Sequence, residues 1–196
     1  MASLPHFPVL VPGFEPGDGT TVVVAPFDRT AIASVATGGQ EAVETALTTA
    51  HALYSDRDGW LSPARRIEIL DTAAALMESR AEELAVEAAR EGGKPLPDSQ
   101  VEVARAIDSV RICVETMRTE GGEVIPMNVN AASAQRLAFT RYEPIGVVVA
   151  VSAFNHPLNL IAHQVAPAVA TGCPVIVKPA EVTPLSCFRF VQILHE

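Results

Sequence analysis

The sequence predicts an α/β fold in which an N-terminal layer of helices precedes the start of a parallel sheet, with a β-hairpin projecting between the two parts. Three observations lead to this prediction. Apolar residues recur at helical spacing across residues 39–120. Two short apolar runs, at residues 145–151 and 174–177, enclose a further helical segment. Before them, residues 121–143 carry two strand-like pieces around a polar middle.

The N-terminal stretch predicts two short strands and then a helix. It is rich in proline and glycine, with a β-branched run at residues 20–24 and an apolar run at residues 31–35, which fit an edge pair or a hairpin. Helical spacing begins at Gly39. The expected buried face of this helix consists of Val43, Ala46, Leu47, Ala50 and Tyr54.

Three more helices complete the predicted layer. Ser62 and Pro63 provide an N-cap followed by a proline at the first helical position. The next helical segment ends at Gly92–Gly93, where a left-handed C-cap costs least. The last helix ends before Gly121–Gly122, and its apolar residues lie three or four positions apart: Val103, Ile107, Val110, Val114 and Met117.

Residues 145–177 predict a strand, a helix and a second strand. The run IGVVVAV is continuously apolar and β-branched, so both strands are expected to be parallel and covered on both faces. Pro157 opens the intervening helix and Gly172 ends it, while a last helix begins after Pro184. Two parallel strands are too little sheet to stand alone. We therefore expect that further sheet is missing or is supplied by another chain.

Composition excludes several classes of function. The net charge of -9 would repel phosphate backbones, so nucleic acid is not an expected partner. No apolar run reaches the roughly eighteen residues of a membrane helix, and no signal peptide opens the chain, so a cytoplasmic protein without a membrane partner is expected. Three widely spaced cysteines argue against disulfides and zinc, and His156 and His163 lack metal-ligand partners, so no metal is expected.

Polar side chains follow both predicted strands at the same edge. Asn155 comes just past the first strand, in VSAFNHPLNL, at the edge where ligands bind in open α/β sheets. An amide there can donate to a developing oxyanion. Lys178 and Glu181 follow the second strand, in VIVKPAEVTPLS. A cation and a carboxylate at this place suit a ribose or a phosphate.

Each of these residues also has a plainer interpretation. Asn155 before the helix fits an N-cap. Lys178 fits a solvated charge at a strand end, and Glu181 fits a carboxylate facing the next helix N-terminus. The glycine-rich turn G-x-G-x-x-G of common dinucleotide folds is absent at both strand ends.

The uninterrupted stretch EPIGVVVAVSAFNHPLNLIAHQVAPAVATGCPVIVKPAEVTPLS resembles the aldehyde dehydrogenase superfamily. Upstream, Trp60, Ser62–Pro63 with Arg65, and the GGKPL at residues 92–96 occur in a similar order to that family. The resemblance covers nearly the whole chain. Around SAFNHPLNLI the sequence resembles lactaldehyde-type and phosphonoacetaldehyde-type members.

The resemblance implies roles for the residues at the strand ends. Asn155 matches the asparagine that forms part of the oxyanion hole for the thiohemiacetal. Lys178 and Glu181 match the pair that contacts the adenosine ribose, and a carboxylate there favours NAD, with NADP as the alternative, because it would repel a 2′-phosphate. The residues expected to line the cofactor cleft are Val151, Ser152, Ala153 and Phe154.

The resemblance also implies an incomplete aldehyde dehydrogenase fold. Residues 1–120 and 144–196 would form part of a Rossmann-like NAD(P)-binding domain, and residues 121–143 the arm through which family members form homo-oligomers. The nucleophilic cysteine, the base and the rest of the nicotinamide site come later in the family, and Cys113, Cys173 and Cys187 do not match the nucleophile's context. The chain is therefore expected to be the N-terminal part of an enzyme that oxidises an aldehyde, and to be inactive alone.

Two alternatives remain open at this point. The chain could be a non-catalytic remnant that uses its hairpin and sheet edge to join a full-length dehydrogenase or itself, because an unpaired edge is a template for pairing. It could also be a nucleotide-binding module that retains affinity for adenosine alone. The sequence does not name the aldehyde.

Overall fold

The computed structural model describes residues 4–15, 17 and 19–196, and the elements below are those of this part of the chain. The helices are α1 (Gln40–Ser55), the short 3-10 helix η1 (Arg57–Gly59), α2 (Pro63–Ser79), α3 (Ala81–Gly92), α4 (Leu96–Thr119), α5 (Pro157–Thr171) and α6 (Pro184–His195). The strands are β1 (His6–Phe7), β2 (Thr20–Val24), β3 (Ala31–Ala36), β4 (Val124–Ile125), β5 (Ala138–Phe139), β6 (Val148–Val151) and β7 (Val175–Lys178).

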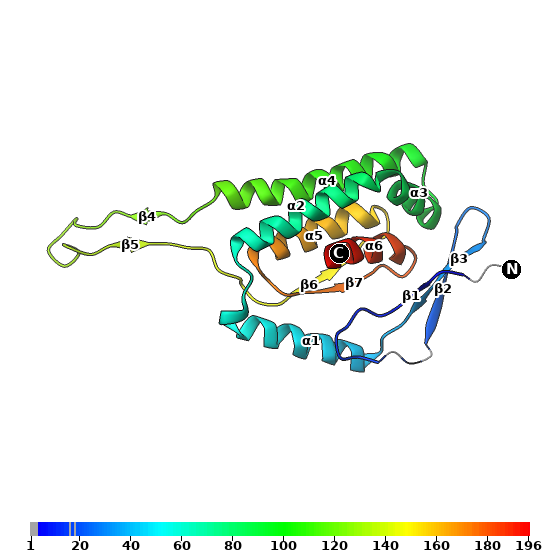
Figure 1. Cartoon of the computed structure of the whole chain (residues 1–196), viewed down its shortest axis with the longest axis horizontal. Coiled ribbons are helices and arrows are strands. Elements are labelled where there is room, and N and C mark those ends of the chain that lie inside the picture. Colours follow the sequence, from blue (N-terminus) through cyan, green and yellow to red (C-terminus); the bar gives the residue numbers. More distant parts are fainter. Residues whose placement is uncertain (1–3, 16, 18) are drawn as a thin grey trace.

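The predicted helical layer is confirmed. The hydroxyl of Ser62 accepts a hydrogen bond from the backbone N–H of Arg65, at 3.2 Å, and so caps α2. Helix α3 ends at Gly93, which has a left-handed φ of 66°. Helices α2, α3 and α4 pack on one another and on α5 and α6, and Figure 1 shows α4 running along the outer side of this stack.

The predicted strand, helix and strand unit is also confirmed. Strands β6 and β7 are parallel, with Val148 opposite Val175 and Val151 opposite Lys178. Helix α5 connects them and ends at Gly172, whose φ is 81°. The unit packs on α2 and α4 through α5, which places the two strand ends beside the helical layer (Figure 1).

The prediction that this small sheet is covered on both faces is wrong for the described chain. Ala150 of β6 is fully buried beneath the helices, whereas Val149 and Val151 are 57% and 56% exposed. Alternation of side chains along the strand puts these two valines on the opposite face. Along β6, the continuous apolar run therefore gives one buried face and one face that is largely open to solvent, whereas β7 is contacted by α1.

The prediction for the buried face of α1 is wrong in part, because the two-stranded sheet is too small to cover it. Ala50 is buried as expected, but Val43 and Leu47 are 54% and 41% exposed. Figure 1 shows α1 on the side of β6 and β7 that faces away from the helical layer. A sheet of two strands offers α1 too narrow a surface to cover its whole apolar stripe, although the helix does contact β7.

The N-terminal strands form a separate sheet in the order β1-β3-β2. The two predicted strands are present as β2 and β3, which pair antiparallel, and β1 adds a parallel pair that the sequence prediction missed. A second buried apolar cluster lies at this sheet and includes Phe7, Val23 and Ile32. Leu185 of α6 also belongs to this cluster. The sheet is thereby attached to the rest of the molecule.

The main core lies between the helices and β6. It contains the largest fully buried side chains of the described residues, among them Leu70, Met77, Leu158, Ile161 and Phe190. Each belongs to α2, α5 or α6, so the core fixes the helical layer against the helices that follow β6 and β7. Among residues 4–15, 17 and 19–196, no helix is long and apolar enough to cross a membrane.

Residues 121–143 form the predicted projecting hairpin. Strands β4 and β5 pair antiparallel, and Figure 1 shows them extending well beyond the ends of the helices. A Cβ at Gly122 would overlap the carbonyl oxygen of Thr140, so only glycine fits at the base of the hairpin. Leu137 and Phe139 are 78% and 63% exposed. The arm therefore presents apolar side chains that the described chain leaves uncovered.

Candidate functional site

The two loops that leave β6 and β7 run side by side at one edge of the sheet. Val151 is opposite Lys178, and the backbone N–H of Ser152 donates to the Lys178 carbonyl at 2.9 Å. The last bonds of the ladder thus bring the loop containing Asn155 next to the loop containing Glu181. All residues that the sequence singled out at the strand ends lie in this one region.

Lys178 and Glu181 form an exposed pair within the second loop. The Lys178 Nζ lies 3.9 Å from Glu181 Oε1, and the two side chains are 56% and 91% exposed. An ion pair this exposed contributes little to stability. The ammonium and the carboxylate therefore stay available as donor and acceptor for the hydroxyl groups of a ligand.

The four residues before Asn155 differ in their surroundings. Val151 and Phe154 are 56% and 66% exposed, which leaves two apolar side chains available to a ligand. Ser152 is buried, and its hydroxyl donates to the carbonyls of Ala153 and Pro157 at 3.2 and 3.4 Å. Val151 and Phe154 are thus better placed than Ser152 to line a cleft.

The interpretation of Asn155 as a helix N-cap is not supported. Helix α5 has His156 at its N-cap position, without a capping side-chain hydrogen bond. The buried carboxylate of Glu102, in α4, accepts hydrogen bonds from the N–H groups of Leu158 and Asn159 instead, at 2.8 and 3.1 Å. Because a distant carboxylate caps the helix, the exposed amide of Asn155 is not needed for this purpose.

Glu91 of α3 caps α6 in a corresponding way. Its carboxylate accepts hydrogen bonds from the N–H groups of Leu185 and Ser186, both at 2.8 Å, and from the Ser186 hydroxyl. Burial raises the pKa of Glu91 to about 7, although these hydrogen bonds act to lower it. In addition, the Thr183 hydroxyl donates to the Phe154 carbonyl at 3.3 Å, which joins the two loops.

Sequence reasoning missed both capping carboxylates. Glu102 lies one position before Val103 and four before Ala106, on the apolar side of its helix. Glu91 lies seven positions after Leu84, again on the buried side. An acidic residue within an apolar stripe is the signal that would have identified them, because a buried carboxylate requires partners.

The cysteines are packed thiols. Cys173 and Cys187 are buried, as predicted, and Cys113 is partly buried. Burial raises the pKa of the Cys113 thiol, and burial together with the charge of Glu91 raises the pKa of Cys187 to about 12. A thiol with a raised pKa is a poor nucleophile at neutral pH.

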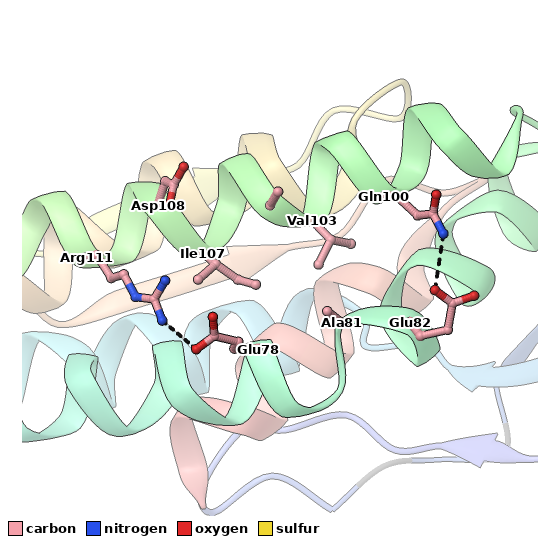
Figure 2. A pocket seen from close by; sticks show the side chains of 9 residues that line it. Glu78, Ala81, Glu82, Gln100, Val103, Ile107, Asp108 and Arg111 are labelled. Atoms are coloured by element: carbon pink, nitrogen blue, oxygen red, sulfur yellow. Dashed lines mark hydrogen bonds and ion pairs between the residues drawn. The ribbon is translucent and has the colours of Figure 1, made fainter.

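A groove of about 350 Å³ lies elsewhere, between α4 and the helices α2 and α3 (Figure 2). Of its charged side chains, Arg111, Glu78 and Glu82 have partners, since Arg111 donates to Glu78 at 2.6 Å and Gln100 donates to Glu82 at 3.2 Å. The groove contains none of the residues predicted at the strand ends. Within the described ranges, no group of three or more His, Cys, Asp or Glu residues is arranged to hold a metal ion.

Residues 14–196 match the sequence profile of the Aldehyde dehydrogenase family. The chain belongs to this family. It is 42% identical over 135 residues to a 3-sulfolactaldehyde dehydrogenase of Priestia aryabhattai, covering 69% of this chain and 28% of that protein. It is 35% identical over 173 residues to a lactaldehyde dehydrogenase of Methanocaldococcus jannaschii, covering 88% of this chain and 36% of that protein.

Solved structures of aldehyde dehydrogenases share the fold. Aldehyde dehydrogenase 21 from Physcomitrella patens, in complex with the reaction product succinate, superposes with a TM-score of 0.90 at 32% identity. The match covers 100% of this chain and 41% of that one. The chain therefore corresponds to the N-terminal part of the aldehyde dehydrogenase fold, and it spans about a third of the length of the curated relatives named above.

Proposed function

We propose that this chain provides one side of a dinucleotide site and one oxyanion donor to an enzyme that oxidises an aldehyde to a carboxylic acid. The observation that carries the proposal is the shared sheet edge. Asn155 follows β6, and Lys178 and Glu181 follow β7, whose last residues pair directly. Family membership together with this placement supports the roles that the sequence resemblance implied.

The residues at this edge suit the adenosine end of a nicotinamide dinucleotide. A ribose presents hydroxyl groups that accept from an ammonium and donate to a carboxylate, and the exposed Lys178 and Glu181 supply both groups 3.9 Å apart. Val151 and Phe154 supply apolar surface beside them. Such a cofactor takes up the hydride of the aldehyde when it is bound.

We favour NAD over NADP for this site. The carboxylate of Glu181 is 91% exposed, so it would meet a 2′-phosphate on the ribose and repel it. Proteins of similar fold have been solved with either cofactor: a betaine aldehyde dehydrogenase of Staphylococcus aureus with NAD+, and a glyceraldehyde-3-phosphate dehydrogenase of Methanocaldococcus jannaschii with NADP. Our preference for NAD in this chain therefore rests on the carboxylate of Glu181.

Asn155 would act on the substrate. Its exposed amide can donate a hydrogen bond to the oxygen that becomes negatively charged when a nucleophile adds to the aldehyde carbonyl. The nucleophile has to come from outside the described residues, because their thiols are buried or have a raised pKa. Free thiols are typical of a reducing compartment, which supports a cytoplasmic location.

Calorimetric titration of the 196-residue chain with AMP, NAD and 2′-phospho-AMP tests the cofactor site. We expect weak binding heats with AMP and NAD, which Lys178→Ala or Glu181→Ala abolishes. In Glu181→Ala, we expect the binding heat with 2′-phospho-AMP to increase. Arg65 and Glu68 are the matched control, since they form an exposed i,i+3 pair on α2. Equal losses in Arg65→Ala and Glu68→Ala, or no heat with the unaltered chain, would contradict the proposal.

An activity assay tests the role of Asn155. The purified chain should produce no NADH from short aldehydes, because burial raises the pKa of the Cys113 and Cys187 thiols and Cys173 is buried. NADH production that depends on one of the three cysteines would refute this. In a longer polypeptide that contains this segment and oxidises an aldehyde, Asn155→Ala should lower kcat about 100-fold or more, as loss of one oxyanion donor does.

The hairpin favours a second role, in assembly. Leu137, Phe139 and Tyr142 are 78%, 63% and 79% exposed along an arm that extends beyond the helices (Figure 1). We propose that the arm joins copies of this chain, or this chain and a full-length dehydrogenase, with or without catalysis. Sedimentation from 1 to about 100 µM, a range that brackets common association constants, should show self-association that Phe139→Asp weakens. A monomer at every concentration would contradict self-association.

A further inference from the structure

Lys94 lies between the buried carboxylate of Glu102 and the loop that contains Asn155. Its ammonium forms an ion pair with Glu102 Oε2, and the two side chains are 16% and 0% exposed. The same Nζ lies 3.4 Å from the Asn155 carbonyl oxygen and 3.4 Å from His156 Nδ1. One cation therefore contacts the main chain of the proposed oxyanion donor and the side chain that follows it.

The position of Lys94 comes from the turn between α3 and α4. Gly93 ends α3 with a left-handed φ of 66°, and Pro95 is the N-cap of α4. Glu102 lies eight residues further along, in α4, and caps α5 through the N–H groups of Leu158 and Asn159. The segment from Asn155 to Asn159 is thus held from the helical layer at both of its ends.

We propose that Lys94 and Glu102 are positioning residues, which fix the Asn155 turn so that its amide is preorganised for the developing oxyanion. The inference rests on the proposed role of Asn155, and it adds the residues that hold it. A preorganised donor stabilises the transition state without first having to change its own position. A mobile amide would therefore stabilise the oxyanion less than a fixed one.

A role in helix capping alone does not account for Lys94. Glu91 caps α6 through two N–H groups in the same way, and the hydroxyl of Ser186 is the third group it binds. Glu102 is instead paired with a cation. That cation, Lys94, contacts the backbone carbonyl of Asn155. The pairing with a cation therefore occurs at the loop that holds the proposed oxyanion donor, and not at the loop before α6.

NMR relaxation and hydrogen exchange on the 196-residue chain test the proposal. In Lys94→Met, the backbone order parameters of Asn155 and His156 should fall from about 0.85 toward 0.6 or below, while those of α2 stay rigid. Lys94→Arg retains the cation and should restore them. In Glu102→Gln, exchange of the Leu158 and Asn159 amides should accelerate about tenfold or more, because a charge-assisted acceptor is lost.

Glu91→Gln is the matched control, since it alters a buried cap that does not contact Asn155. It should accelerate exchange at Leu185 without changing the order parameter of Asn155. Unchanged order parameters in a folded Lys94→Met variant, or an equal fall in Glu91→Gln, would overturn the proposal. Should Lys94→Met fail to fold, the double variant with Glu102→Gln leaves no unpaired charge and carries the same measurement.

The outcome is independent of catalysis. If Asn155 loosens in Lys94→Met while Asn155→Ala leaves kcat unaltered in an active longer polypeptide, the positioning contact is real and the proposed role of Asn155 is wrong. If Asn155→Ala is inactive but its turn stays rigid without Lys94, the positioning inference alone fails. In the active polypeptide, Lys94→Met should lower kcat about tenfold or more with little change in KM, as loss of transition-state interactions does.

Discussion

Glu91 should make the stability of this chain fall as the pH rises from acid to neutral. Glu91 is 1% exposed, its carboxyl group caps α6, and burial raises its pKa from 4.5 to about 7. Because the pKa in the folded chain lies above that in the unfolded chain, the stabilisation is fully present below about pH 4.5 and is lost as the pH rises to about 7.

The expected loss follows from the size of this shift. One pKa unit corresponds to about 1.4 kcal/mol, so the full difference is about 3–4 kcal/mol, of which about 2–3 kcal/mol falls between pH 5 and pH 8. Hydrogen bonds lower the pKa values of Asp28, Glu143 and Glu196. These carboxylates titrate below the window and do not obscure the effect of Glu91.

Urea unfolding of the unaltered chain and of Glu91→Gln at several pH values isolates this group. Glutamine has nearly the same volume and does not titrate, so the difference in unfolding free energy between the two proteins should fall by about 2–3 kcal/mol from pH 5 to pH 8. In the unaltered chain, this fall in free energy corresponds to a decrease of about 1 M in the urea midpoint of unfolding. A difference that is constant over this range, or that grows with pH, would refute the reasoning.

Three further substitutions have expected outcomes. Met77→Ala should lower the unfolding free energy by about 2–5 kcal/mol, because Met77 is fully buried in the main core; thermal unfolding measures this, and a loss below about 1 kcal/mol would count against it. Ser62→Ala should cost about 1 kcal/mol through loss of the α2 cap, an effect that Ser62→Thr should largely avoid in the same assay. Gly122→Ala should open the hairpin base, seen by NMR as loss of the Thr140 N–H bond to the Glu123 carbonyl, with the helices unaltered; an intact bond would contradict the steric argument.

Local signals in the sequence predicted the elements well. Ser62 and Pro63 start a helix where expected, and Gly93 and Gly172 end helices with positive φ. These residues act within one turn of the backbone, so their effect can be inferred without knowing what lies nearby. The order of the helical layer, hairpin and parallel strands followed from them.

Features that depend on distant partners were not predicted. The apolar run of β6 fits burial on two faces, but the exposed side chain of Val149 shows that only one face of β6 is buried. The residues of a strand do not reveal which other elements cover it. Strand β1 has two residues, too few for any pattern, and its pairing joins His6 to Ser34. The edge with Asn155 and Lys178 was predicted, whereas the buried carboxylate that caps α5 was not.

The caps of α5 and α6 make the ordering of the two loops a cooperative event. Glu102 is 56 residues from Leu158, and Glu91 is 94 residues from Leu185. Helices of 15 and 12 residues are marginal in water by themselves, so peptides of residues 157–171 and 184–195 should be mostly unfolded. During folding, we therefore expect neither loop to take its final shape until α3 and α4 have docked.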